Sequence, residues 1–172
     1  MMKVVLVGYM GCGKSMIGKL LSEKTELNFL DLDEIIEKEE NCTIIKIFEC
    51  KGEVYFRKKE HLIFKDLMQN ENSFILSLGG GTPCYSNNHE LLLNENAVSV
   101  YLSASIDTLY SRLLLEKSKR PILADKSESE LKDFIAKHLF DRSYYYNQSK
   151  FKVDVNNKSA NEILLEILKI LA

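Results

Sequence analysis

Short apolar runs alternate with longer amphipathic segments along most of the chain. The first run, Val4 to Val7, is rich in β-branched residues and has the length of a buried strand. Comparable runs predict strands at 27–30, 74–78, 97–102 and 151–155. This alternation predicts an α/β fold: a three-layer sandwich with a parallel sheet of five strands and helices on both faces.

Apolar residues recur at helical spacing between these runs, which predicts the helices. One helix is expected from Lys14 to about Leu21. A short helix is expected over 44–50, capped by Thr43 and ended by Gly52. The other expected helices cover 34–39, the region after Gly52 up to 68, 105–116, 131–146 and 159–171.

Composition narrows the class of protein. A chain of 172 residues with 45% hydrophobic and 28% charged residues fits one globular domain. The net charge of -2 gives no basic excess, so we expect no nucleic-acid partner. The four apolar residues after Lys3 are too few for a signal peptide or a membrane span, and we expect no membrane partner. Four cysteines without C-x-x-C spacing fit reduced thiols in a cytoplasmic protein, and three scattered histidines do not fit a metal site.

A glycine-rich loop joins the first strand to the first helix. Residues 8–15 read GYMGCGKS, which fits G-x-x-x-x-G-K-[ST] in its required strand–loop–helix context. Such a loop turns several backbone N–H groups toward one phosphate at a helix N-terminus. We expect Lys14 to reach the β- and γ-phosphates and the Ser15 hydroxyl to bind Mg²⁺. The motif indicates a nucleoside triphosphate site, and a turn that only connects strand and helix is the alternative.

Two carboxylates, Asp31 and Asp33, follow the second strand. Residues two apart on an extended segment point to the same side, and strand ends in such sheets face the ligand crevice. One acid is then expected near Mg²⁺ and the other near the phosphoryl acceptor. The alternative is an aspartate cap for the helix at 34–39, and Asp33 could serve both purposes. Because the third strand carries no acid at its end, Asp31 is the favoured metal partner.

Three further features have both a functional and a plain interpretation. Arg57 and Glu60 are three residues apart on a helix, which alone predicts an ordinary ion pair. Three consecutive glycines at 79–81 let the backbone approach a small molecule closely, or form a flexible loop. The polar segment 117–130, which contains Arg120 and Pro121, fits either a mobile lid or a charged surface loop.

Five separated motifs together resemble the shikimate kinase family, of the nucleoside monophosphate kinase-like branch of phosphate-loop proteins. They are GYMGCGKS at 8–15, DLD at 31–33, GEVYFRKKE at 52–60, LGGGTP at 78–83, and KRPIL at 119–123 followed by Arg142 with Tyr146. The resemblance covers essentially the whole chain. It implies a single P-loop kinase domain, 1–172, with an acceptor-binding region at about 31–62 and a lid at about 117–130. It also implies a cytoplasmic monomer that transfers the γ-phosphoryl group of ATP to the 3-hydroxyl of shikimate, on the route to chorismate and the aromatic amino acids.

Matched residue by residue, the resemblance implies a role for each site residue. The catalytic residues would be Asp33, near the attacking hydroxyl, and Lys14 and Arg120, which would stabilise charge on the phosphoryl group. The residues in contact with ATP would be Gly11, Cys12, Gly13, Lys14, Ser15, Met16, Arg112 and Arg120. The residues in contact with shikimate would be Asp33, Arg57, Gly79, Gly80, Gly81 and Arg142. Ser15 and Asp31 would bind Mg²⁺.

The physical chemistry agrees with these roles, with two open points. Arginine's planar fork suits a small carboxylate, and Glu60 is a candidate to orient Arg57. Arg112 is the candidate for the adenine contact, although its spacing to Arg120 departs from the family pattern. Cys12 lies near a helix N-terminus, where thiols tend to ionise, so we expect it to be alkylated faster than the other cysteines and protected by ATP.

Two other classes of function remain open from the sequence. The nearest is another small-molecule kinase of the same branch, acting on gluconate or a nucleoside monophosphate. The second is a nucleotide-dependent switch with little turnover. The chain lacks an N-K-x-D guanine-reading motif, and an acceptor-site carboxylate has no evident role in a switch.

Overall fold

The computed structural model describes residues 2–116, 123 and 126–172. In these residues five strands form one sheet with the order β2-β3-β1-β4-β5. The strands are β1 (Lys3–Val7), β2 (Asn28–Asp31), β3 (Phe74–Ser77), β4 (Ala97–Ser103) and β5 (Phe151–Asp154). All neighbouring strands are parallel, so their carboxyl ends meet at one edge of the sheet. The expected sheet is therefore confirmed.

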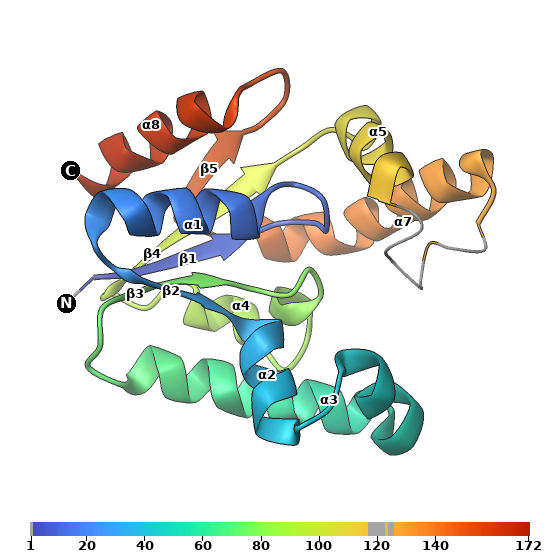
Figure 1. Ribbon diagram of the computed structural model, residues 1–172, viewed down its shortest axis with the longest axis horizontal. Coiled ribbons are helices and arrows are strands. Elements are labelled where there is room, and N and C mark those ends of the chain that lie inside the picture. Colours follow the sequence, from blue (N-terminus) through green and yellow to red (C-terminus); the bar gives the residue numbers. More distant parts are fainter. Residues whose placement is uncertain (1, 117–122, 124–125) are drawn as a thin grey trace.

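Helices cover both faces of the sheet (Figure 1). On one face α1 (Lys14–Thr25) packs beside α8 (Ala160–Leu171), and on the other lie α3 (Ile44–Gln69) and α4 (Asn88–Leu91). The remaining elements are α2 (Leu32–Glu40), the 3-10 turn η1 (Thr82–Cys84), α5 (Ile106–Glu116) and α7 (Glu128–Tyr146). Both chain termini lie at the edge of the molecule opposite α5 and α7 (Figure 1). This arrangement is the three-layer sandwich that the sequence pattern predicts.

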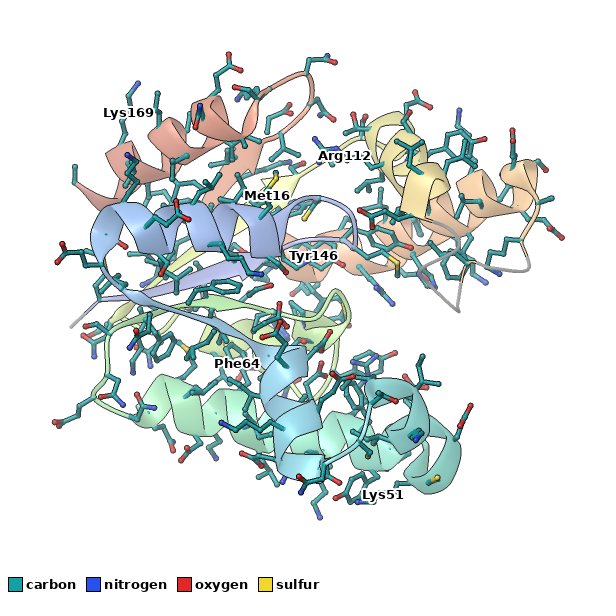
Figure 2. All side chains as sticks on the ribbon, in the orientation of Figure 1. Met16, Lys51, Phe64, Arg112, Tyr146 and Lys169 are labelled. Atoms are coloured by element: carbon teal, nitrogen blue, oxygen red, sulfur yellow. The ribbon has the colours of Figure 1, made fainter. Side chains whose placement is uncertain are left out.

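The core forms where the apolar runs meet the apolar helix faces. Val4 to Val7 in the central strand β1 are fully buried, because helices cover that strand on both sides. Phe64 of α3 and Tyr146 of α7, both labelled in Figure 2, are also fully buried. A rigid centre of this kind holds the loops at the carboxyl edge in fixed relative positions.

Helix α3 is kinked at Gly52, where the predicted short helix ends. Thr43 caps its start by accepting a hydrogen bond from the Lys46 N–H, as predicted. Gly52 has a φ of 80° and a ψ of 170°, which lies outside the helical region, and a helix resumes directly after it. Since a left-handed φ favours glycine, this position redirects the chain so that the second part of α3 carries Arg57 and Glu60.

Two helices begin earlier than predicted. Helix α2 starts at Leu32, so Asp33 lies in its first turn and not on an extended segment. Helix α7 starts at Glu128 and not at Leu131, because Ser127 and Glu130 form a reciprocal capping box. A capping box is built from polar residues, and hydrophobic spacing alone therefore misses it. The expected lid, 117–130, lies largely outside the described residues.

Within the part of the chain that the structure describes, none of the helices combines the length and apolar character needed to span a bilayer.

Candidate active site

The loop between β1 and α1 encloses the ammonium group of Lys14. Gly8, Gly11 and Gly13 all have positive φ angles, and Gly13 forms the N-terminal boundary of α1. The Lys14 Nζ donates to the carbonyl oxygens of Gly8 at 2.8 Å and Tyr9 at 3.1 Å. The geometry therefore places a buried cation and a free helix N-terminus together, which is the arrangement that binds phosphate.

Ser15 and Asp31 lie in contact beside this loop. The Ser15 hydroxyl donates to Asp31 Oδ2 at 3.0 Å, and the other carboxylate oxygen, Oδ1, accepts from the Asp33 N–H at 3.1 Å. Asp31, and not Asp33, is thus the cap of α2, which corrects one of the alternatives raised by the sequence. The expected pairing of Ser15 with Asp31 is present, and it combines a hydroxyl and a carboxylate, two oxygen ligands that suit Mg²⁺.

A cavity of about 460 Å³ lies next to these groups. The predicted residues that line it are Gly11, Gly13, Lys14, Ser15, Met16, Asp31, Asp33, Gly79, Gly80 and Arg112. Met16 at the start of α1 and Arg112 on α5 are labelled in Figure 2. One Arg112 nitrogen, Nη1, donates to the carbonyl oxygens of Gly11 and Cys12, each at 3.2 Å, so two hydrogen bonds attach this arginine to the loop. The cavity therefore unites the residues predicted to contact ATP, apart from Cys12 and Arg120.

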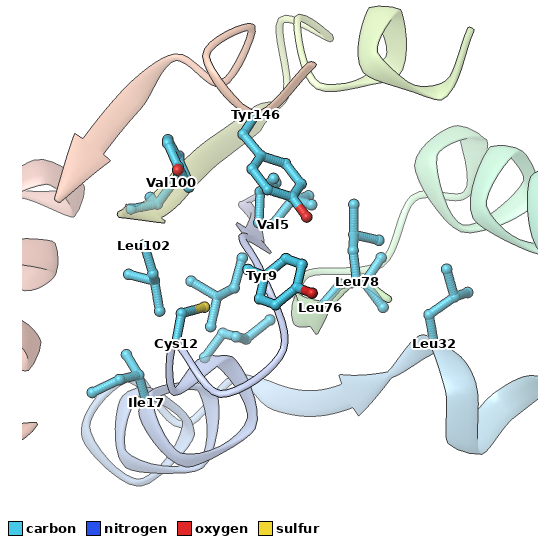
Figure 3. Close-up of a cluster of buried hydrophobic side chains, with 14 of the residues drawn as sticks. Val5, Tyr9, Cys12, Ile17, Leu32, Leu76, Leu78, Val100, Leu102 and Tyr146 are labelled. Carbon is cyan, nitrogen blue, oxygen red and sulfur yellow. The ribbon is translucent and has the colours of Figure 1, made fainter. Parts of the chain in front are cut away.

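Cys12 points away from the cavity and into the core. Its side chain is 1% exposed and lies among buried apolar residues such as Ile17 and Leu102 (Figure 3). By contrast, Cys50 is exposed. Burial argues against the expectation that Cys12 is alkylated first, because a buried thiol lacks the solvent access that a reactive cysteine needs. Arg120 lies outside the described residues.

A second cavity, of about 590 Å³, opens beside the first. The predicted residues that line it are Asp33, Arg57, Gly79, Gly80, Gly81 and Arg142. These residues come from α2, α3, the loop after β3, and α7. The structure thus brings together the whole predicted acceptor set, although the residues are spread over more than 100 positions in the sequence.

Arg57 is held firmly at the wall of this cavity. Its Nη1 donates to Glu60 Oε2 at 2.9 Å, and Glu60 is 1% exposed. The guanidinium carbon lies 4.0 Å from the centre of the Tyr85 ring and 5.1 Å from that of Phe56. The ion pair with Glu60 therefore exists, but it is buried and fixes the direction of the guanidinium group, unlike the ordinary surface pair that spacing alone predicts.

Asp33 lies between the two cavities and lines both. Burial is the main cause that raises the pKa of Asp33 to about 6. The carboxylates of Asp31 and Glu60 contribute to this rise, and the Lys14 ammonium opposes it. A carboxylate with a pKa near neutrality is a better proton acceptor than an exposed aspartate, while it stays largely ionised at pH 7.

Tyr146 and Arg142 tie α7 to the acceptor cavity. The Tyr146 hydroxyl donates to the Gly80 carbonyl oxygen at 2.6 Å, which fixes the glycine loop. Figure 3 shows Tyr146 and Tyr9 as members of the same cluster of buried side chains. Arg142 lies with its guanidinium carbon 5.7 Å from the centre of the Tyr9 ring. Tyr146, which accompanies Arg142 in the resemblance to the family, therefore lies at the site.

Several residues of the acceptor cavity are missed by sequence reasoning. Its apolar wall comes from α3, through Ile44, Phe48 and Phe56. The i, i+4 spacing of Ile44 and Phe48 could have indicated a shared face, but not that this face borders a cavity. Tyr85, which stacks on Arg57, has no signal in the sequence. Apolar contacts of this kind suit a small ring bearing a few polar groups.

Comparison with known proteins agrees with this geometry. A family model described as shikimate kinase matches residues 10–172. A shikimate kinase from Flavobacterium johnsoniae is 58% identical over 172 residues, with 100% of both chains covered. A crystal structure of shikimate kinase from Bacteroides thetaiotaomicron matches with a TM-score of 0.90 and 32% identity, over 99% of this chain and 98% of that one. A shikimate kinase from Acinetobacter baumannii, solved in complex with shikimate, matches with a TM-score of 0.86 and 28% identity, over 99% and 93% of the two chains.

Three observations agree with one another: the 58% identity to a shikimate kinase over the full length, a family model that covers nearly all of the chain, and the arrangement of both cavities. The chain belongs to the shikimate kinase family.

Proposed function

We propose that this protein transfers the γ-phosphoryl group of ATP to the 3-hydroxyl of shikimate, with the two cavities as its ATP and shikimate sites. As a member of the shikimate kinase family it is an ATP-dependent small-molecule kinase, and its products are shikimate 3-phosphate and ADP. The observation that carries the assignment of the sites is the position of Asp33, which lines both cavities where donor and acceptor would meet.

In this proposal the acceptor cavity recognises a carboxylate and a hydroxylated ring. Arg57 and Arg142 both line the cavity and would hold the carboxylate of shikimate. The apolar wall from α3 would cover the ring, and the backbone of Gly79, Gly80 and Gly81 would allow its close approach. Two cationic donors leave little reason for a neutral acceptor to be preferred.

Asp33 is proposed to orient the 3-hydroxyl and to accept its proton. As the hydroxyl oxygen forms a bond to the γ-phosphorus, the bond from that phosphorus to the β–γ bridging oxygen breaks, and ADP leaves with its electron pair. Lys14 would neutralise charge on the phosphates. Arg120, which lies outside the described residues, is proposed to add a second cation.

Ser15 and Asp31 are the residues that would hold Mg²⁺. Among the described residues no three His, Cys, Asp or Glu side chains gather as a metal site. In kinases Mg²⁺ is usually held by one or two protein oxygens together with phosphate oxygens and water. When bound, the ion supplies positive charge against the β- and γ-phosphates. The contact of the two side chains at 3.0 Å keeps both oxygens at one place for it.

The proposal divides the chain into a core, an acceptor-binding region at about 31–62 and a lid at about 117–130. The lining of the acceptor cavity supports an acceptor-binding region at about 31–62. Four of the lining residues lie within that range: Asp33, Ile44, Phe48 and Arg57. The protein is proposed to act as a monomer, which light scattering in solution would test. A cytoplasmic location is proposed because the co-substrate is ATP.

The test is ADP release by the purified protein with Mg²⁺ and ATP, measured with and without shikimate. Gluconate and nucleoside monophosphates serve as alternative acceptors in the same assay. Release that depends on shikimate is the expected result. Release that depends on another acceptor would overturn the assignment of the acceptor cavity, and ATP binding without acceptor-dependent turnover would favour a nucleotide-dependent switch.

A further inference from the structure

Thr82 lies behind the acceptor cavity, in contact with the residue that orients Arg57. Its hydroxyl donates to Glu60 Oε1 at 2.7 Å, and its side chain is fully buried. The other carboxylate oxygen of Glu60, Oε2, accepts from Arg57 Nη1 at 2.9 Å. The carboxylate therefore joins a hydroxyl on one side to a guanidinium group on the other. Thr82 itself does not line the cavity.

Resting on the proposed function, we propose that Thr82 is a positioning residue for shikimate: its hydroxyl fixes the Glu60 carboxylate, and through it aims Arg57 at the substrate carboxylate.

The direction of the buried Glu60 carboxylate decides how many of its oxygens pair with Arg57. A carboxylate and a guanidinium group can pair through one oxygen or through two. With Oε1 bound to Thr82, Glu60 offers one oxygen to Arg57 Nη1. Since Arg57 Nε donates to Glu53 Oε1 at 3.4 Å, the Nη2 group is the part of the guanidinium that this arrangement leaves for a ligand. Without the hydroxyl, Oε1 is a buried acceptor without its partner, and rotation toward Arg57 is the nearest way to satisfy it. Such a rotation would draw the guanidinium group away from the cavity.

The backbone of Thr82 is held independently of its hydroxyl. Its N–H donates to the Gly79 carbonyl oxygen at 3.1 Å. Its own carbonyl oxygen accepts from Asn88 Nδ2 at 2.9 Å, and Asn88 Oδ1 lies 2.7 Å from His61 Nδ1 on α3. The loop is thus attached to α3 through its main chain. Removal of the hydroxyl therefore changes one contact and leaves the others in place.

Gly79 shows how tightly these groups converge at the cavity. A Cβ atom on Gly79 would lie 2.9 Å from Thr82 Oγ1, 3.1 Å from Asp33 Oδ1 and 3.3 Å from Glu60 Oε1. Only glycine leaves room for the three side chains at once. Oxygen atoms of Thr82, Asp33 and Glu60 thus surround Gly79, whose backbone lines both cavities, so a change in the direction of the Glu60 carboxylate would act at the cavity wall.

The experiment compares Thr82→Val, which keeps the branched shape, with Thr82→Ser, which keeps the hydroxyl. Loss of one hydrogen bond to a buried charge predicts a rise in KM for shikimate of roughly five- to thirtyfold in Thr82→Val. The KM for ATP should change by less than about twofold, and Thr82→Ser should restore most of the affinity for shikimate. Thr82→Ala removes the same donor and replaces Thr82→Val if that variant does not fold.

Two controls separate positioning from a general structural effect. Thr108→Val removes a hydroxyl whose bond to Asn156 Oδ1 is also 2.7 Å long, and it should leave the KM for shikimate unchanged. The methyl ester of shikimate lacks the carboxylate charge. If Thr82 acts through Arg57, Thr82→Val should reduce the preference for shikimate over its ester, measured by calorimetric titration, and should add nothing to Arg57→Ala.

Equal KM values for shikimate in the wild type and Thr82→Val, or an unchanged preference over the ester, would overturn the inference. A wild-type protein without shikimate-dependent ADP release would instead overturn the proposed function. The two failures are therefore distinguishable in one series of measurements.

Discussion

The hydroxyl of Tyr9 lies 3.1 Å from Nδ1 of His138. Tyr9 belongs to the phosphate loop, and His138 lies one turn before Arg142 on α7. Burial raises the pKa of Tyr9 to about 12, so the hydroxyl keeps its proton at pH 7 and is able to donate. Burial, together with the charge of Arg142, lowers the pKa of His138 and favours the neutral ring. This hydrogen bond joins the phosphate loop to the helix that carries Arg142, one of the two arginines proposed to bind the carboxylate of shikimate.

Tyr9→Phe should remove this link without a change in packing. We expect the free energy of unfolding to fall by about 0.5–1.5 kcal/mol, the usual net value of one neutral hydrogen bond. Urea denaturation at pH 7.5 measures it. In a His138→Leu background the same substitution should cost much less, and an additive double mutant would show that the two side chains are not coupled.

Asp33→Asn should abolish most of the activity. If Asp33 orients the hydroxyl and accepts its proton, turnover should fall by roughly a hundredfold or more, with ATP binding retained. In the wild type, kcat/KM should fall on the acid side of about pH 6, because the protonated carboxyl cannot accept a proton. Steady-state rates between pH 5 and 8.5 test both statements. Near-normal turnover of the variant would rule out this role.

The same substitution should make the fold more stable at neutral pH. The pKa of Asp33 is raised to about 6 in the folded protein, above its value of 3.8 in an ordinary aspartate, so the ionised form is disfavoured by folding. That cost is absent below about pH 4, grows as the pH rises to 6, and reaches about 1–3 kcal/mol at pH 7. Asp33→Asn should therefore raise the melting temperature at pH 7.5, and the difference from wild type should shrink as the pH approaches 4. A variant less stable than wild type at both pH values would contradict the burial argument.

Arg57→Ala should chiefly weaken shikimate binding. Loss of one partner of a buried charge pair costs about 2–5 kcal/mol, and here the variant also leaves Glu60 without its guanidinium partner. We expect a large rise in KM for shikimate and little change in KM for ATP. Lys58→Ala, an exposed cation one residue along α3, is the matched control. Equal effects of both substitutions would place Arg57 outside the binding site.

Cysteine labelling should follow burial and not proximity to the phosphate loop. Cys50 is exposed and should react first with a maleimide. Burial raises the pKa of the Cys84 thiol to about 11, which slows it, and the 1% exposed Cys12 should react last. Time-resolved alkylation with peptide mass spectrometry gives the order. Labelling in denaturant, where all four should react alike, is the control, and early ATP-sensitive labelling of Cys12 would restore the expectation drawn from the sequence.

Much of the fold could be predicted from the sequence because the signals are local. A run such as Val4 to Val7 indicates a strand that is covered on both faces, and the glycines of GYMGCGKS set the backbone of their own loop. The helix cap at Thr43 and the kink at Gly52 are likewise set by residues a few positions apart in the sequence. The resemblance to one family added the roles of Arg57 and Arg142 at the acceptor, which no local pattern assigns. The start of α7 was missed because its capping box is polar, like a loop.

Only the tertiary structure decided the burial, the contact partners and the side-chain direction of each site residue. Spacing predicted a pair of Arg57 and Glu60, but only packing buries it and adds Tyr85 and Thr82 around it. Cys12 shows the opposite case. Its position near a helix N-terminus suggested a reactive thiol, whereas the fold buries its side chain in the core. The physical reason is the same in both: burial and charge depend on groups distant in sequence that meet at the carboxyl edge of the sheet, whereas turns, caps and strand-forming runs depend on residues a few positions apart.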